Sequence, residues 1–231
     1  MIVINIFLAA IPSILIVLYV YRKDKQKKEP PRLVLATFIL GFFAVLPALI
    51  LELIVSEFGE KLTGTAYLLF RAFVIAAFVE EGVKLGVIRI FVYRKPAFDE
   101  VTDGILYAVT ASLGFAFFEN ILYSFGPPAL LIIRGLTAVP LHAAASGIMG
   151  YYLGFAKVKQ ENHILKGFLI AIAIHGLYDF LLFTRTMYGF LVIPLLIAAI
   201  LYLRTLFRKA QKLDRQNGDS TSAGSFKLEN S

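Results

Sequence analysis

The sequence contains no cysteine and no tryptophan, and charged residues make up only 17% of its 231 positions. Without cysteine, the chain forms no disulfide, has no thiolate nucleophile and cannot hold a cysteine-ligated zinc ion or iron–sulfur cluster. Without tryptophan, tyrosine and phenylalanine must supply any aromatic belt at a membrane surface. Soluble domains are usually about 25% charged, so the low charge argues against a fold that buries one core in water.

Apolar residues account for 58% of the chain, and the mean hydropathy is +0.76. A helix needs about 20 mostly apolar residues to cross the hydrocarbon core of a bilayer. Seven segments meet this condition, at residues 2–21, 33–56, 66–92, 101–125, 129–156, 165–184 and 187–207. Strands that alternate apolar and polar residues, as an outer-membrane barrel requires, are absent from the sequence. We therefore predict an all-α fold, a polytopic membrane helix bundle of about seven transmembrane helices.

The basic residues predict the orientation of this bundle. Of the 23 lysines and arginines, eighteen follow the first, third, fifth or seventh segment, whereas only Lys61 and Arg185 lie in the opposite connections. Basic residues accumulate on the cytoplasmic side of membrane proteins, so we expect the N-terminus outside and the C-terminus in the cytoplasm. The net charge of +7 then reflects topology and contact with the lipid bilayer, and no nucleic acid is expected as a partner.

The chain divides by composition into a membrane domain, residues 1–210, and a polar tail, residues 211–231. The tail is rich in serine, asparagine and glycine, which is typical of disorder. We expect it to be a disordered cytoplasmic segment that the chemistry does not need.

Among the ionisable residues inside the predicted spans, nine stand out: Arg71, Glu80, Glu81, Lys84, Glu119, Arg134, His142, His175 and Asp179. Each charge at this depth costs at least a few kcal/mol, so such groups normally face the bundle interior and pair with one another. Ion pairs that fix helix packing are the simplest interpretation. The clustering of nine such residues at similar depth on four helices favours a functional site instead.

The densest group is Glu80-Glu81-x-x-Lys84, in which both carboxylates can reach the ammonium on one helical face. Two adjacent carboxylates in a medium of low dielectric repel each other, and burial disfavours their charged forms. A carboxylate poised near neutral pH suits a general base that activates water. Lys84 would hold one carboxylate ionised and so divide the two into different roles.

Three further residues extend this set onto other helices. His142 precedes Ser146 by one turn among small residues, His175 precedes Asp179 by one turn, and Glu119 comes from another span. Together with Glu80 and Glu81, these side chains are able to ligate zinc or to position a water. No His-Glu-x-x-His pattern is present, which excludes the usual zincin helix. Their positions along the spans predict a cavity between the midplane and the outer leaflet.

These motifs resemble the PrsW family of bacterial intramembrane proteases, distant relatives of the CAAX prenyl endopeptidases and bacteriocin-processing proteins. The resemblance is carried by Glu80-Glu81-x-x-Lys84, Phe115-x-x-x-Glu119, His142 and His175-x-x-x-Asp179, in this order. It also includes Phe98-Asp99-Glu100 with Asp103-Gly104, and extends from the first span to about residue 207. In the CAAX enzymes the second motif ends in His and the first ends in Arg one position later. Glu119 and Lys84 depart from both, which favours the PrsW branch and disfavours prenylated substrates.

The resemblance implies a protease in the bacterial plasma membrane that hydrolyses a peptide bond of a single-span membrane protein. PrsW-like proteins make the first cut, on the extracytoplasmic side, in an anti-sigma factor during envelope-stress signalling. The implied chemistry has Glu80 or Glu81 as general base for a water, and His142 or His175 as the group that stabilises the oxyanion or protonates the leaving amine. Glu119 is placed with the catalytic residues, and Lys84, Asp179 and Phe115 with the supporting ones.

Metal dependence stays open at this stage. We favour a metal-free mechanism without a cofactor, and a bound Zn²⁺ is the alternative, with His142, His175, Glu119 and Glu81 as the residues available to it. Ser112 and Ser146 lack the Gly-x-Ser-x-Gly turn of a serine hydrolase. The main rival function is a proton- or cation-coupled transporter, because buried carboxylates and histidines also build proton relays. A scaffold without activity is disfavoured because the full acid, base and imidazole set is present.

Overall fold

The computed structural model describes residues 2–24 and 27–228, with side chains for 3–24 and 27–218. The chain is 87% helical, and no strand occurs in the described ranges. The helices are α1 (Ile2–Lys23), α2 (Pro31–Phe43), α3 (Val45–Ser56), α4 (Gly64–Phe70), α5 (Val79–Val87), α6 (Val101–Leu122), α7 (Pro128–Leu136), α8 (Ala138–Lys159), α9 (Ile164–Phe183) and α10 (Val192–Leu228). Two π-helical segments, η2 (Arg71–Phe78) and η3 (Ile88–Val92), flank α5, and three 3₁₀ turns occur at Glu57–Gly59 (η1), Tyr123–Phe125 (η4) and Met187–Leu191 (η5).

Six helical segments of the described chain are long and apolar enough to cross a membrane. The prediction of an all-α polytopic bundle is therefore confirmed. The expected seventh span, residues 66–92, continues from α4 through η2 and α5 to η3. It differs from the other six because it carries five charged residues: Arg71, Glu80, Glu81, Lys84 and Arg89.

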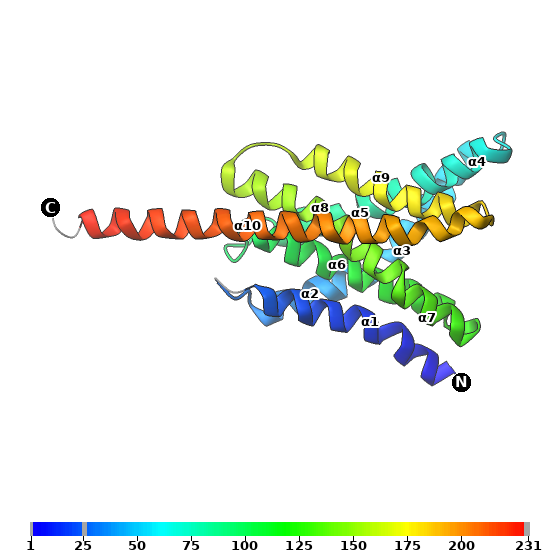
Figure 1. Ribbon diagram of the computed structural model, residues 1–231, viewed down its shortest axis with the longest axis horizontal. Coiled ribbons are helices and arrows are strands. Elements are labelled where there is room, and N and C mark those ends of the chain that lie inside the picture. The colour runs from blue at the N-terminus through cyan, green and yellow to red at the C-terminus, as the bar shows by residue number, and fades with distance from the viewer. Residues whose placement is uncertain (1, 25–26, 229–231) are drawn as a thin grey trace.

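The helices alternate in direction, as the distribution of basic residues predicts. Figure 1 shows the N-terminus, the α6–α7 connection and the α9–α10 connection at one end of the molecule. The α1–α2 and α8–α9 connections and the C-terminal part of α10 lie at the other end, together with most of the basic residues. We call these the basic-poor end and the basic-rich end. Assignment of the basic-rich end to the cytoplasm stays a prediction, and Lys25 lies outside the described residues.

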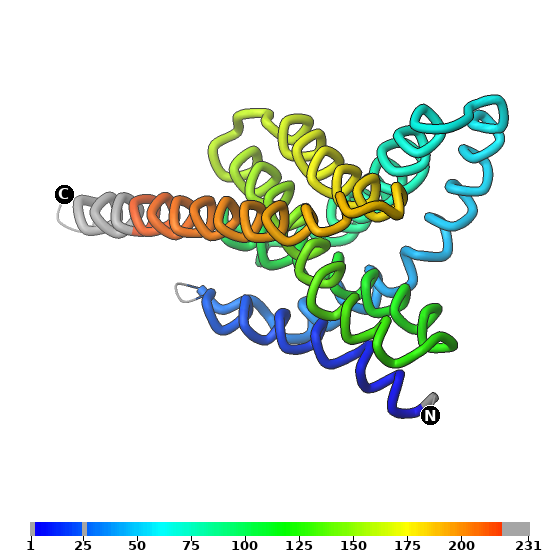
Figure 2. Tube along the Cα trace, turned by 45° about the vertical axis from the view of Figure 1, so that its right-hand side comes forward, coloured from blue at the N-terminus to red at the C-terminus, as the bar shows by residue number. Residues whose placement is uncertain are grey.

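Helix α6 forms the centre of the bundle, and seventeen of its 22 residues are buried. It packs against α1, α2, α8 and α10. Helices α6 and α8 approach closely through glycines, because a Cβ on Gly150 would lie 2.2 Å from the carbonyl oxygen of Gly104. The small residues around His142 on α8 thus allow the close helix packing expected of them. By contrast, α3 and α4 project away from the rest of the bundle, as Figure 2 shows.

Two predicted spans are interrupted. Residues 33–56 divide into α2 and α3 at Ala44, and residues 129–156 divide into α7 and α8 at Thr137. The reason in both cases is a proline, because Pro47 and Pro140 occupy the third position of the following helix. The first amides of a helix have no intrahelical acceptor, so a proline at this position removes no hydrogen bond from the helix.

The predicted boundary between domain and tail at residue 211 stays a prediction, and it does not coincide with the end of a helix. Helix α10 passes through this boundary, and Asp214 is only 4% exposed. Its carboxylate accepts hydrogen bonds from the backbone amides of Val101 and Thr102, at 2.8 and 3.0 Å, and from the Thr102 hydroxyl at 2.6 Å. Composition suggested disorder, but this cap on the first turn of α6 holds the segment against the bundle. Residues 229–231 lie outside the described residues.

Candidate active site

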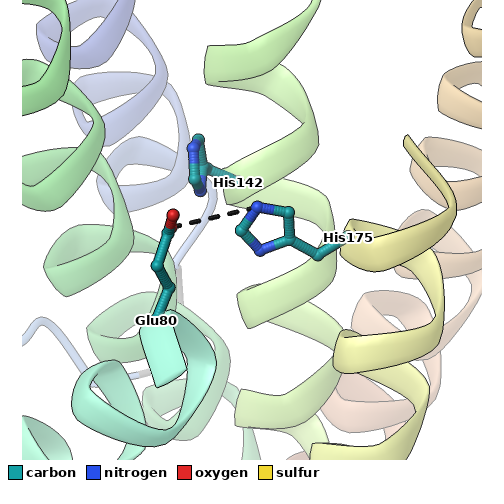
Figure 3. A group of neighbouring side chains, drawn as sticks. All are labelled: Glu80, His142 and His175. Atoms are coloured by element: carbon teal, nitrogen blue, oxygen red, sulfur yellow. Dashed lines mark ion pairs between the residues drawn. The ribbon is translucent and has the colours of Figure 1, made fainter. Parts of the chain in front are cut away.

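Four helical segments bring the predicted site residues together within the bundle. Helix α5 supplies Glu80, Glu81 and Lys84, α6 supplies Phe115 and Glu119, α8 supplies His142, and α9 supplies His175 and Asp179. Figure 3 shows Glu80 facing the rings of His142 and His175. The two imidazoles are 4.9 Å apart between ring centroids and meet edge to face.

Lys84 is fully buried and satisfies three acceptors at once. Its Nζ donates to Glu80 Oε2 at 3.1 Å, to Glu81 Oε1 at 2.9 Å and to Nδ1 of His142 at 2.9 Å. The ammonium also lies 4.3 Å from the centre of the Phe115 ring, a cation–π contact. An ammonium has only protons to donate, so Nδ1 of His142 accepts and the ring proton resides on Nε2. Lys84 therefore selects the tautomer of His142 as well as pairing with both glutamates.

Glu81 is completely buried, and both of its oxygens are occupied. Oε1 accepts from Lys84 and from Nδ1 of His175 at 3.0 Å, while Oε2 accepts from the Ser146 hydroxyl at 2.6 Å. The Ser112 hydroxyl, 3.0 Å from Ser146, donates to the carbonyl oxygen of His142. The two serines thus hold the glutamate and the histidine-bearing backbone in place, and neither contacts Nε2 of an imidazole.

The two histidines present their Nε2 atoms toward carboxylates. Nε2 of His175 lies 3.9 Å from Glu80 Oε2 and 3.4 Å from Asp179 Oδ2. Nε2 of His142 lies 2.8 Å from Glu119 Oε2, and Glu119 is also 3.7 Å from Arg134. Each imidazole is therefore fixed on its Nδ1 side by the α5 cluster and directed on its Nε2 side toward acids that can exchange protons with it.

A cavity of about 410 Å³ lies over these groups. Its titratable lining consists of Glu52, Arg71, Glu80, Glu119, Tyr123, Arg134, His142, His175, Tyr178 and Asp179. Phe115 also lines the cavity, whereas Glu81 and Lys84 do not. The lining comes from α3, η2, α5, α6, η4, α7, α8 and α9, and it lies toward the basic-poor end. This is the side on which the sequence places the outer leaflet.

Glu52 is the carboxylate of the cavity lining that the sequence analysis missed. Glu52 lies on α3, between apolar neighbours Leu51 and Leu53. A carboxylate within an otherwise apolar span was the signal for it. Arg71 and Arg134, noted as buried charges, also belong to the wall: Arg71 stacks 4.3 Å over the Phe183 ring, and Arg134 lies 3.9 Å over the Tyr123 ring.

The donor atoms in the cavity fit a divalent transition metal. Glu80, His142 and His175 each offer a ligand atom, and these atoms lie within 4.8 Å of one another. A carboxylate and two imidazoles are a common set for catalytic zinc, and His175 donates its other ring proton to a carboxylate as metal-bound histidines do. The set differs from that expected from the sequence, because Glu81 is occupied and Glu80 stands in its place. His142 can offer Nε2 only after losing the proton on that atom.

A polytopic helical bundle with carboxylates and imidazoles around a cavity at membrane depth defines the class of intramembrane hydrolases. The sequence model described as PrsW family intramembrane metalloprotease matches residues 29–204. The chain therefore belongs to the PrsW family, and the resemblance seen in the motifs is confirmed. Family membership supports a multi-pass bacterial membrane protease over a transporter.

Relatives named "Protease PrsW" extend over most of the chain. The protein from Geobacillus kaustophilus is 37% identical over 78% of this chain and 80% of its own length. That from Bacillus subtilis is 34% identical over 80% and 86%, and that from Clostridioides difficile is 31% identical over 90% and 91%. No solved structure gives a significant match to the chain.

Proposed function

We propose that this protein makes the first, extracytoplasmic-side cut in a single-span membrane protein of the anti-sigma factor class. The observation that carries the proposal is the position of the cavity. Glu80, His142 and His175 face a space of about 410 Å³ at the basic-poor end of the bundle. A peptide segment entering from the outer leaflet would meet these residues before it reached the midplane.

Within this proposal Glu80 is the general base and Glu81 a positioning residue. Glu80 lines the cavity, where its Oε2 pairs with Lys84 at 3.1 Å and lies 3.9 Å from Nε2 of His175. Glu81 has no exposed surface, and its oxygens already accept from Lys84, His175 and Ser146. A base must reach the water from which it takes a proton, and only Glu80 of the pair does so. Glu80 would remove a proton as the water oxygen attacks the scissile carbonyl carbon.

The two histidines take the complementary roles. Lys84 keeps the ring proton of His142 on Nε2, so this N–H is available to stabilise the developing oxyanion. His175, between Glu80 and Asp179, is placed to receive the proton from the base and deliver it to the leaving amine. Proton transfer to the amine nitrogen completes cleavage of the C–N bond and returns Glu80 to its ionised form.

The family description names a metal, and Glu80, His142 and His175 are the residues that would hold it. A Zn²⁺ ion there would supply Lewis-acid polarisation of the scissile carbonyl. In either case Glu81 orients His175 and Lys84 orients His142.

Co-expression with a panel of single-span anti-sigma factors tests the substrate class. We expect the wild type to shorten at least one member, at a bond within or just outside the outer half of its span. The Glu80→Gln variant should leave the same protein intact, and the matched control Glu60→Gln, an exposed carboxylate at the same end, should cleave normally. Equal product from wild type and Glu80→Gln, or cleavage on the cytoplasmic side, would contradict the proposal.

A further inference from the structure

A second group of carboxylates lies at the basic-rich end, far along the bundle from the cavity. Asp24 follows α1, Glu29 precedes α2, Asp99 and Glu100 precede α6, and Asp103 lies in its first turn. Asp24, Glu29 and Asp103 are at most 1% exposed. The group includes the Phe98-Asp99-Glu100 and Asp103-Gly104 motif, which the proposed proteolytic mechanism does not use.

Some of these carboxylates have partners. Asp103 Oδ2 accepts from the backbone amides of Asp99 and Glu100, at 2.9 and 2.6 Å. Glu29 accepts from the Tyr107 hydroxyl, and Asp99 pairs with Lys27. The Glu100 carboxylate accepts in turn from the backbone amide of Asp103, and this capping box shapes the N-terminus of α6.

The unpartnered oxygens belong to three residues. Both oxygens of Asp24, Oδ1 of Asp103 and Oε2 of Glu100 are buried, and none accepts a hydrogen bond from any residue within 2–24 or 27–228. Buried carboxylate oxygens normally have partners, because an unpaired charge in a protein interior costs several kcal/mol. One ligand oxygen from each of Asp24, Glu100 and Asp103 lies within 4.8 Å of the other two.

We propose that Asp24, Glu100 and Asp103 bind a hard divalent cation, Ca²⁺ or Mg²⁺. These ions take carboxylate and carbonyl oxygens at about 2.0–2.6 Å, so ligand oxygens within 4.8 Å of one another can share one ion. No histidine contributes, which distinguishes this site from the cavity and disfavours zinc. Glu100 is only partly buried, and it provides a path by which the ion can enter from water.

The surrounding charges support this assignment. Lys27 and Lys28 lie on the outside, where they contact Asp99 and the Tyr21 carbonyl oxygen. The two lysines do not neutralise the repulsion among Asp24, Glu100 and Asp103. A cation bound by these three carboxylates would offset it and would connect the end of α1 to the start of α6.

Calorimetric titration of the full chain in detergent, after EDTA treatment and desalting, tests the site with CaCl₂ and MgCl₂ in separate arms. We expect saturable binding of at least one ion and a higher melting temperature with it. Asp24→Asn and Glu100→Gln should each weaken binding by about tenfold or more, since even indirect ligand contacts are worth 10–100-fold. Glu161→Gln, an exposed carboxylate at the same end, and Glu80→Gln, in the cavity, should both bind like wild type.

Three results would overturn the proposal. One is a wild type that neither binds nor is stabilised by either ion. A second is binding lost in Glu80→Gln but kept in Asp24→Asn and Glu100→Gln, which would assign the ion to the cavity. A third is an Asp24→Asn variant with a higher melting temperature than the wild type, together with a wild type that binds neither ion. That result would mean that the carboxyl groups share protons with one another and do not need a cation. If Asp24→Asn does not fold, the more exposed Glu100→Gln decides.

Discussion

The two adjacent glutamates of α5 should differ in how much the same substitution lowers stability. Glu81→Gln removes the charge that balances Lys84 and that orients His175, in a site with no exposed surface. Breaking a buried ion pair costs about 3–5 kcal/mol. Glu80→Gln leaves Lys84 paired with Glu81, and the new amide oxygen at the edge of the cavity can still accept from Lys84, so we expect a loss of about 1 kcal/mol. The difference in stability is therefore at least about 2 kcal/mol.

Both variants should lose cleavage activity, but for different reasons. Glu80→Gln removes the proposed base, and general-base catalysis contributes about 10²–10⁴-fold. Its cleavage should therefore be nearly abolished in a protein that melts close to the wild type. Glu81→Gln should also be impaired, but in a protein whose melting temperature is clearly lowered and whose residual activity falls further on warming.

Both quantities are measurable on the full chain in detergent micelles. Thermal loss of the helical circular dichroism signal reports stability, and single-turnover cleavage of a co-purified substrate reports the chemical step. The assignment of roles is refuted if Glu80→Gln lowers the melting temperature as much as Glu81→Gln does. It is equally refuted if Glu80→Gln cleaves at a rate close to that of the wild type.

Three other changes test separate parts of the structure. Gly150→Ala should destabilise the bundle by about 1–3 kcal/mol in thermal unfolding, because the added Cβ would meet the Gly104 carbonyl oxygen. The control Gly86→Ala, with open space around it, should be neutral or stabilising, and equal effects of the two substitutions would contradict close α6–α8 packing. Truncation after residue 210 removes the Asp214 cap and should lower the melting temperature, while truncation after residue 218 should leave stability and cleavage unchanged; two equivalent truncations would show that the cap contributes nothing. If Glu80, His142 and His175 hold the family's metal, dialysis against a zinc chelator should abolish cleavage and added Zn²⁺ should restore it. Unchanged cleavage by the metal-free protein would support the metal-free mechanism.

Much of the site could be predicted because charge is rare in this sequence. Glu80, Glu119, His142, His175 and Asp179 stand out as ionisable residues in apolar helices, and all of them line the cavity. Their chain order also matches a known family pattern. The general rule that buried charges pair is therefore enough to group these residues from the sequence.

The division of labour between Glu80 and Glu81 was not predictable in the same way. Adjacent residues on a helix point about 100° apart, and the neighbours that meet each direction come from distant segments. Ser146 and His175 occupy Glu81, and these contacts span 65 and 94 residues of sequence. The same limitation applies to Asp214, because its carboxylate contacts a helix that begins more than a hundred residues earlier.

The Asp214 cap has a consequence for how the protein is made. Chains are synthesised from the N-terminus, and α6, the central helix, enters the membrane while α10 is still untranslated. Its amides at Val101 and Thr102 must therefore rely on water or lipid headgroups until the last helix arrives. The bundle closes at its basic-rich end only after α10 has been translated and inserted, so a ribosome stalled before residue 214 would expose an open intermediate to the quality-control proteases of the membrane.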